Sequence, residues 1–381
     1  MAFKAKYMAI KVSKGLKYTV FTTNIIAIVL LILSTKAQTI PPSSIMFIAY
    51  LGMGFPFLLA LNIVYLALWI LFFRWKYILV QLIALIICWD SIYTYIPLNS
   101  RADFIPDDCI KVMSYNVRGF DWLTGQEARE NPILEYIANS GADIVCLQEF
   151  AVDDKKGRNR MISLNEFDDI MKDYPYRAIV KLGDENEPHT YGLACYSKYP
   201  ILKQARLPIQ SAFNGAAMYE IRINRKNIIV VNNHLESNRI TAEDKELYKQ
   251  LVLTQNQNMI DDVAASIQNR LEPAFKARER QADIINRCIR EQRENVKAMI
   301  LCGDFNDPPI SYAYRTIRGN LVDSFKESGW GLGITYHANG FWFRIDYIMH
   351  TKNIKSYNST VDKVKYSDHY PIYSYISLKG I

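Results

Sequence analysis

A long segment without a single charged side chain, between Lys36 and Arg74, constrains this chain more than any other feature. Two further apolar segments flank it, at residues 18–35 and 77–97. A helix that spans a membrane needs about 20 predominantly apolar residues, and each of the three segments is long enough. We therefore predict three transmembrane helices within residues 1–100.

Two alternatives remain open within this part of the chain. A cleavable signal peptide is the alternative for the first segment, because lysines precede it, although a processed secreted protein would not need the two segments that follow. Asp90, in the third segment, is expected to be an interfacial residue near the outer end of its helix. The other interpretation of Asp90 is a functional acid inside the membrane.

The basic residues predict how these helices are oriented. Five lysines precede the first segment, and Arg74 and Lys76 lie between the second and the third, whereas Lys36 alone lies between the first and the second. By the positive-inside rule, the N-terminus and the turn at Arg74 are cytoplasmic. After three crossings, residues 101–381 are expected on the extracytoplasmic side.

The net charge of +7 belongs entirely to the membrane part. Residues 1–100 hold eight of the 45 basic side chains and one of the 38 acidic ones, so residues 101–381 are formally neutral. The composition therefore gives no argument for a polyanionic partner. With 50% apolar and 13% aromatic residues, a disordered chain is excluded.

Beyond residue 103, short strand-like runs alternate with helical stretches, which is typical of an α/β domain. Eight runs rich in β-branched and aromatic residues predict strands: CIKVMSY, DIVCLQ, YGLACYS, AAMYEIRI, NIIVVNN, KAMILCGD, IDYIMH and IYSYISL. Several are continuously apolar, which indicates sheets covered on both faces. Helices are predicted at residues 131–140 and within 241–296. We expect one domain over residues 101–381.

The six cysteines show no C-x-x-C pair and no metal-ligand spacing. Cys146 and Cys302 lie inside apolar runs that are predicted to be core strands. We expect most of the six to be buried small hydrophobic residues, and a single disulfide stays an open alternative.

Polar side chains of catalytic type follow the apolar runs. They are Asn116, Gln148 and Glu149, then Asn232, Asn233 and His234, then Asp304 and Asn306, and finally Asp346, Asp368 and His369. One such ending by itself would be a turn or a strand cap. Several endings in one domain can converge on a single pocket, where carboxylates, amides and imidazoles bind hard metal ions or move protons.

In their order and spacing, the motifs N-V-R-G, L-Q-E, N-H-L, G-D-F-N, R-I-D-Y-I and S-D-H-Y-P resemble those of the endonuclease/exonuclease/phosphatase superfamily. That group includes DNase I-like nucleases, abasic-site endonucleases, neutral sphingomyelinases and inositol polyphosphate phosphatases. The resemblance covers about residues 109–378 and none of the membrane part. It implies a four-layer α/β sandwich, in which two mixed β-sheets pack face to face with helices outside, and metal-dependent hydrolysis of phosphoesters.

The resemblance also implies a metal site. Glu149 resembles the carboxylate ligand of Mg²⁺, with Mn²⁺ as a possible substitute, and Asn116 resembles the amide that helps to arrange that site. Asp368 is similar to a further acid on the metal or phosphate side.

Roles in the reaction are implied for five more residues. Asp304 and Asn306 resemble the pair that orients and deprotonates the attacking water. His369 resembles the group that contacts the phosphoryl oxygens, with Asp346 holding its ring and raising its basicity. His234 matches a second histidine of DNase I-like nucleases and sphingomyelinases, a transition-state stabiliser or leaving-group acid.

One position departs from the abasic-site branch, which carries an aspartate where this chain has Arg118. The same branch lacks the histidine found here at position 234, so abasic-site repair is not expected. His189, His337 and His350 belong to no motif and are expected to be structural.

The functional expectation is a membrane-anchored, Mg²⁺-dependent phosphoesterase of the endonuclease-like phosphodiesterase type. A sphingomyelinase-like lipid phosphodiesterase, a phosphatase and an inactive tethered binding module are the alternatives. The expected partners are the lipid bilayer and a phosphoester substrate, which could be nucleic acid, a phospholipid head group or a small molecule; no protein partner is predicted. Trp342, between Phe341 and Phe343, is either part of a strand or an aromatic platform for the substrate.

Overall fold

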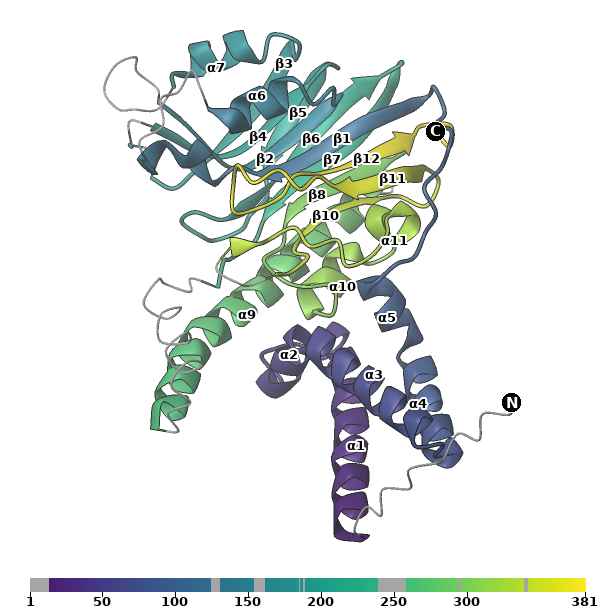
Figure 1. The fold of residues 1–381 in the computed structure, drawn as a ribbon. Helices are drawn as coiled ribbons and strands as arrows, with labels where there is room; N and C mark the ends of the chain where they lie inside the picture. The colour runs from purple at the N-terminus through teal and green to yellow at the C-terminus, as the bar shows by residue number, and fades with distance from the viewer. Residues whose placement is uncertain are drawn as a thin grey trace.

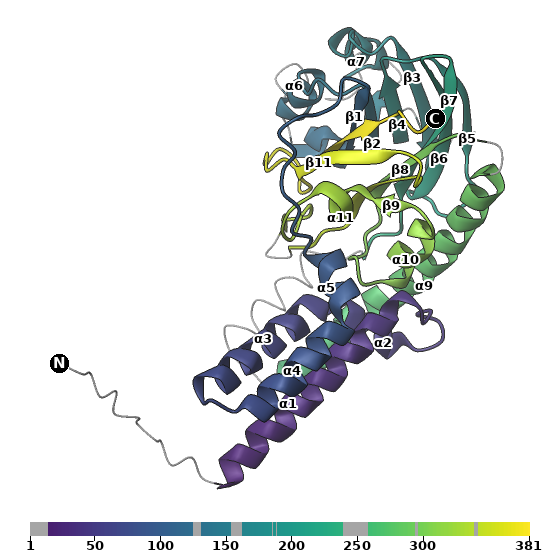
Figure 2. The ribbon, with the colours of Figure 1, turned by 90° about the vertical axis from the view of Figure 1, so that its right-hand side faces the viewer.

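A computed structural model describes residues 14–124, 131–153, 162–184, 186–187, 189–238, 258–293, 296–338 and 342–381. Its two views show a β-rich body standing on a bundle of N-terminal helices (Figures 1 and 2). The helices come from the apolar segments, and the body begins with the first strand at Cys109.

Three transmembrane helices are expected in the N-terminal part, and its apolar segments form one continuous helix and two bent pairs of helices. Their elements are α1 (Lys14–Thr35), η1 (Lys36–Gln38), α2 (Met46–Met53), α3 (Phe55–Leu71), α4 (Trp75–Ile87) and α5 (Trp89–Tyr95). One continuous helix, Tyr18–Gln38, is long and apolar enough to cross a membrane. The helices of the pairs α2–α3 and α4–α5 are each too short to cross alone; each pair passes the same test when taken together, and the pairs are bent by 63° and 66° at their breaks.

The first of these bends has a local cause in the sequence. Pro56 lies in the first turn of α3, where its missing N–H and fixed φ suit a helix start but not a helix interior. Gly52, two residues before the bend at Gly54, has no room for a side chain, since a Cβ there would lie 2.4 Å from the backbone oxygen of Ile310. The bend therefore brings α2 against the β-rich body.

The body contains two six-stranded mixed sheets, as expected from the resemblance. The first has the order β11-β12-β1-β2-β4-β3 and the second the order β5-β6-β7-β8-β10-β9. Their bounds are β1 Cys109–Asn116, β2 Ile144–Asp153, β3 Tyr176–Leu182, β4 His189–Ser197, β5 Ile201–Arg206, β6 Gly215–Ile223, β7 Lys226–His234, β8 Met299–Asp304, β9 Val322–Asp323, β10 Asp346–His350, β11 Lys355–Val361 and β12 Ile372–Ser377. Each sheet has one parallel pair, β1–β2 and β7–β8, and all its other pairs are antiparallel.

All eight predicted strands are confirmed, and they are the eight inner strands of the two sheets. The four strands that the sequence did not predict, β3, β5, β9 and β11, are the four edge strands. In β5, five of six residues are exposed, so its sequence ILKQAR has no apolar run to detect.

Helices cover the outer face of each sheet and complete the four-layer sandwich. The first sheet carries α6 (Pro132–Ala138) and α7 (Leu164–Ile170) in one apolar cluster, and the second carries α9 (Asn258–Arg293) and α10 (Tyr312–Arg318) in another. A third cluster fills the space between the sheets and contains Cys146, Cys195 and Cys302. All six cysteines are free, so the open alternative of a disulfide is resolved. The helix predicted at residues 131–140 is confirmed as α6; α9 confirms a helix within 241–296, of which 241–257 lie outside the described residues.

The N-terminal helices dock directly on the body through short helix α11 (Ser324–Ser328) and the loops near it (Figure 1). Lys326 of α11 lies 2.8 Å from Asp90 and donates to the hydroxyl of Thr94 at 2.7 Å. Ile310 of the body is buried in an apolar cluster with Phe55 and Tyr95. Asp90 thus pairs with a cation of the body at the end of the helical bundle that faces it.

Candidate active site

The two parallel strand pairs bring the predicted site residues to one edge of the sandwich. In the first sheet Asn116 is in register with Gln148, one residue before Glu149. In the second sheet His234 is in register with Asp304, which is also opposite Asp346 of β10. Because the carboxyl ends of parallel strands meet at the same edge, the fold collects side chains that are far apart in the sequence.

Two of these residues have a backbone in the left-handed conformation. Glu149 has a φ of 52°, at an irregularity where the pairing of β2 with β4 shifts between Leu147 and Phe150. Asn306 also has a φ of 52°. Gly303 lies so close to the neighbouring strand that a Cβ would be 2.0 Å from the backbone oxygen of Asn233. Strained conformations of this kind cluster at functional sites.

Asn116 links the two sheets at the centre of the site. Its amide nitrogen lies 3.0 Å from Glu149 Oε1 in its own sheet and 3.0 Å from Asp304 Oδ2 in the other. Its amide oxygen accepts from the backbone N–H of Arg118 at 3.0 Å. Both N–H donors of this buried amide therefore bind carboxylates, one in each sheet.

Asp304 is fully buried and held by its neighbour in the G-D-F-N motif. The backbone N–H of Asn306 donates to Asp304 Oδ1 at 2.8 Å, and the Asn306 amide donates to the backbone oxygen of Leu235 at 3.0 Å. Burial and the nearby charge of Asp346 raise the pKa of Asp304 to about 6, against the opposing effect of His369 and His234.

His369 and Asp346 form the carboxylate–histidine pair that the motifs suggest. His369 Nδ1 donates to Asp346 Oδ2 at 2.9 Å, which leaves Nε2 3.7 Å from Asp304 Oδ2. Burial lowers the pKa of His369, but Asp346 and Asp304 outweigh it and raise the pKa to about 10. The ring is therefore a cation at neutral pH with one N–H directed at the centre of the site.

His234 and Asp368 lie on opposite sides of this centre. His234 Nε2 is 3.5 Å from Glu149 Oε1 and 3.9 Å from Asp304 Oδ2. Asp368 Oδ2 is 3.9 Å from the guanidinium of Arg118, which follows Asn116 through a turn in left-handed conformation. Hydrogen bonds and ion pairs thus connect seven of the eight predicted site residues directly, and Arg118 links Asp368 to Asn116.

Three residues that support the site carry no signal in the sequence. The Asn214 amide lies 3.4 Å from the ring nitrogens of His234. The hydroxyl of Thr335 accepts from the backbone N–H groups of Ile345 and Asp346 at 3.0 and 3.1 Å, and the Tyr336 ring packs edge-on against His369 at 5.1 Å. These residues lie in irregular segments, so no periodicity or motif marks them.

The donor set fits a divalent cation. Within the described residues, ligand atoms of Asp304, Asp346 and His369 lie within 4.8 Å of one another. This group differs from the ligands expected from the resemblance, Asn116, Glu149 and Asp368. The carboxylates of this group offer hard oxygen ligands, including Asp346 Oδ1, which is buried without a hydrogen-bond partner. Hard oxygen ligands of this type are those that Mg²⁺ prefers.

The three histidines without a motif have partners outside this centre. His350 is buried and lies 3.1 Å from Glu327 and 2.9 Å from the backbone oxygen of Thr351. His337 stacks on Tyr370, with ring centroids 4.0 Å apart, and His189 lies 3.8 Å from Glu187. These contacts agree with structural roles.

Comparison with known sequences and structures identifies the family. Residues 113–369 match the sequence model described as "Endonuclease/Exonuclease/phosphatase family". The chain belongs to this family. The match supports a phosphoesterase, that is, a hydrolase that acts on phosphoester bonds. Residues 17–95 match a second model, described as a domain of unknown function. No curated protein matches the sequence.

Three solved structures are similar to this chain over 70% to 74% of its length. The endonuclease/exonuclease/phosphatase of Bacteroides vulgatus is 19% identical over 71% of this chain and 99% of its own, with a TM-score of 0.49. The human Nocturnin catalytic domain with bound sulfate is 16% identical over 74% and 95%, with a TM-score of 0.49. Beta toxin of Staphylococcus aureus is 17% identical over 70% and 99%, with a TM-score of 0.44. The family assignment rests on the sequence model.

Proposed function

We propose that this chain is a membrane-anchored, Mg²⁺-dependent phosphodiesterase. The observation that carries the proposal is the buried Asp304, which lies between a histidine held by its own carboxylate and the amide of Asn116. A buried acid with a raised pKa beside a positioned imidazole is suited to hydrolysis at phosphorus.

In the proposed reaction, Asp304 accepts a proton from the attacking water while Asn306 holds its carboxylate in place. The water oxygen bonds to phosphorus, one ester P–O bond breaks, and the departing alcohol oxygen takes up a proton, for which His234 is the candidate donor. His369 donates a hydrogen bond to a phosphoryl oxygen as negative charge develops there, and Asp346 keeps its ring oriented.

A divalent cation would supply charge neutralisation on the phosphoryl oxygens. Glu149, assisted by Asn116, and the carboxylate of Asp368 are the residues proposed to hold it, and Asp304 and Asp346 supply further oxygens close by. Partial exposure of the Glu149 side chain, 30%, suits a metal that keeps several waters.

An inactive tethered module is the alternative from a different class. A module that had lost catalysis would be expected to lack a carboxylate or the terminal histidine of the site. Here Glu149, Asp304 and His369 are all present: Asn116 donates to both carboxylates, and His369 lies 3.7 Å from Asp304. This favours the enzyme.

The deciding experiment is hydrolysis by the full-length protein in detergent. Bis(p-nitrophenyl) phosphate, plasmid DNA, sphingomyelin and inositol phosphates are offered with Mg²⁺. Exhaustive chelation with EDTA is expected to abolish turnover, and Mg²⁺ or Mn²⁺ to restore it. Turnover that survives chelation would contradict the metal proposal, and failure to hydrolyse any phosphoester would contradict the activity.

The proposed location places the N-terminus in the cytoplasm, residues 1–100 in the bilayer as an anchor, and the catalytic domain, residues 101–381, outside the cytoplasm. The lysine asymmetry of the sequence supports this orientation. A reporter enzyme that works only outside the cytoplasm is expected to be active when fused after residue 381. A reporter that works only in the cytoplasm is expected to be active when inserted beside Trp75. The reverse pattern would overturn the orientation.

A further inference from the structure

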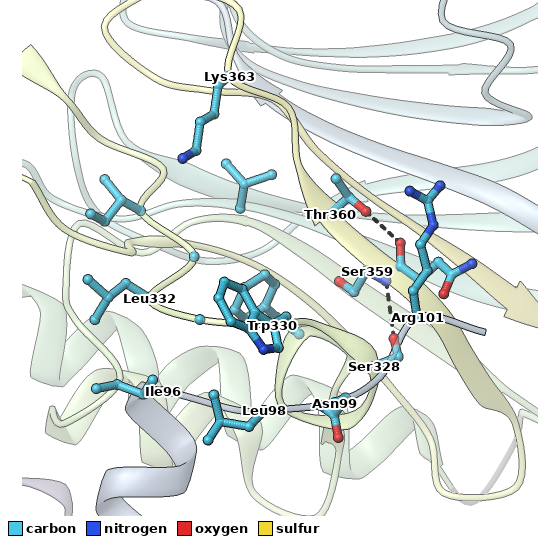
Figure 3. A pocket seen from close by; sticks show the side chains of 16 residues that line it. Ile96, Leu98, Asn99, Arg101, Ser328, Trp330, Leu332, Ser359, Thr360 and Lys363 are labelled. Carbon is cyan, nitrogen blue, oxygen red and sulfur yellow. Dashed lines mark hydrogen bonds between the residues drawn. The ribbon is translucent and has the colours of Figure 1, made fainter. Parts of the chain in front are cut away.

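A groove of about 620 Å³ opens where the last N-terminal helix meets the catalytic domain (Figure 3). Its walls come from the linker after α5, from the loop that follows α11 and from strand β11. A volume of this size is typical of sites for small molecules.

Hydrogen bonds between the linker and the catalytic domain build this groove. Leu98 pairs with Trp330 as an isolated antiparallel bridge, and the N–H of Gly331 donates to the backbone oxygen of Pro97 at 2.8 Å. The Asn99 amide donates to the backbone oxygens of Lys326 and Gly329 at 3.0 and 2.9 Å. The linker is therefore fixed against the domain, and the groove begins directly at the end of a membrane-segment helix.

Large apolar side chains are exposed along this groove. Trp330 is 73% exposed, Leu98 63% and Leu332 43%. Contiguous apolar surface of this kind marks a site of interaction, and tryptophan is favoured where a protein meets a lipid interface. Ile96, at the end of α5, continues the same surface toward the helical bundle.

Positive charge lies beyond the apolar part. Arg101 and Lys363 line the groove, and no acidic residue is among its described lining residues. Figure 3 shows the Lys363 ammonium directed toward the cavity, on the side of Trp330 opposite Ile96 and Leu98. An occupant that complements both parts has an apolar chain toward the bundle and an anionic group toward the domain.

Two segments that line the groove lead along the chain to residues in and around the candidate active site. Ile334 lines the groove, the next residue, Thr335, holds the backbone of Asp346, and Tyr336 packs against His369. On the other wall, Lys363 belongs to the segment that leads from β11 to His369. A molecule in the groove thus touches the segments that position the catalytic histidine and its carboxylate.

We propose that this groove binds a membrane phospholipid, with an acyl chain against Trp330, Leu98 and Leu332 and its anionic phosphate group directed past Lys363 toward the catalytic centre. The inference rests on the proposed function, because it names the class of substrate. That class is an amphiphilic phosphoester of the bilayer in which the anchor lies. Hydrolysis then adds water across one ester P–O bond and releases the alcohol on one side and the phosphorylated product on the other.

Photolabelling tests the binding without any need for activity. The full-length protein is placed in nanodiscs that contain phosphatidylglycerol with a diazirine on its acyl chain, irradiated, and mapped by peptide mass. Label is expected on residues 96–101 and 325–334 as well as on the membrane helices. Leu332→Glu, which places a charge in the apolar part, is expected to reduce label on 325–334 about tenfold.

Label confined to the membrane helices, or unchanged label in Leu332→Glu, would overturn the binding site. Tyr176→Ala is the matched control, because Tyr176 is an aromatic residue of edge strand β3, 39% exposed and outside the groove. Leu332 is itself 43% exposed, so its replacement opens no cavity in the core.

Turnover of two substrates tests the substrate class. Trp330→Ala and Lys363→Ala are expected to lower kcat/KM about tenfold for phosphatidylglycerol in mixed micelles and to leave that for bis(p-nitrophenyl) phosphate unchanged. Lys352→Ala, an exposed lysine outside the groove, is the control for charge.

The possible failures are distinguishable. Equal losses on both substrates, or a wild-type protein that cleaves the soluble diester but not the lipid, would overturn the lipid as substrate. A wild-type protein that cleaves neither would overturn the proposed function, while the labelling still decides whether the groove binds lipid.

Discussion

Two buried polar clusters, one among the N-terminal helices and one at the catalytic centre, are built on opposite principles. In the helical bundle, Asn24 of α1 donates to Gln81 of α4 at 2.8 Å, and Gln81 donates to Asn62 of α3 at 2.7 Å. Trp69 donates to Asn24 at 2.8 Å, and Asn62 to the backbone oxygen of Leu58 at 2.8 Å. All of these groups are neutral, and donors meet acceptors around the cluster.

The catalytic centre brings together carboxylates instead. Asp304, Asp346 and Glu149 lie around two histidines, His369 and His234, and the amide of Asn116, and Asp346 Oδ1 has no hydrogen-bond partner. Burial and like charge raise the pKa of Asp304 to about 6. The comparison shows that a buried polar cluster with matched partners stabilises a fold, whereas one with unmet negative charge indicates a site for a cation and a reaction.

The largest expected effect separates activity from stability at the catalytic centre. Asp304→Asn is expected to reduce kcat by at least about 10²–10³, since it removes the proposed proton acceptor for the attacking water. The same change removes a buried charge that repels Asp346, so the melting temperature in EDTA is expected to stay equal or rise. Asp103→Asn, an exposed carboxylate, is the control. A large fall in melting temperature would assign Asp304 to the fold.

The second prediction concerns the pH dependence that Asp346 imposes on His369. With its pKa raised to about 10, the imidazolium persists at neutral pH and is lost only as the pH rises through that value. Asp346→Asn keeps a hydrogen-bond acceptor but removes the charge, so the pKa of His369 falls toward its ordinary value of about 6.5.

The pH profile of kcat/KM checks this shift. The alkaline limb is expected to move to lower pH, and activity at pH 8 to fall about 30-fold. A variant with reduced activity but an alkaline limb at its original position would show that His369 does not act as a cation.

An intermediate effect on stability is expected in the helical bundle. Gln81→Leu leaves Asn24 without its acceptor and Asn62 without its donor, at a cost of about 1–2 kcal/mol in the free energy of unfolding. The melting temperature in detergent is expected to fall, with kcat of the folded protein unchanged. Leu79→Ala, at an exposed position of the same helix, is the control, and it is expected to change the melting temperature less.

The smallest expected effect belongs to Trp342, which is 65% exposed close to the R-I-D-Y-I motif. This exposure argues against a core position; its neighbour Phe341 lies outside the described residues. If the ring binds substrate, Trp342→Ala raises KM a few-fold with little change in kcat, because the ring contacts ground and transition states alike. An unchanged KM would exclude the platform.

Sequence alone determined the features that depend on local pattern. The inner strands of both sheets are continuous apolar runs because neighbours cover both their faces, and their buried ends carry the residues of the site. Segments without charged residues marked the N-terminal helices, because a helix in apolar surroundings carries no charge along its length.

Tertiary structure decided what depends on residues distant in the chain. Edge strands such as β5 gain their conformation from a single neighbour and leave no apolar run in the sequence. Lys326 meets Asp90, and Thr335 meets Asp346, through the packing of whole elements that no spacing reveals. The groove beside Trp330 forms where the linker and the catalytic domain meet. Because these segments are far apart in the sequence, only the folded structure reveals it.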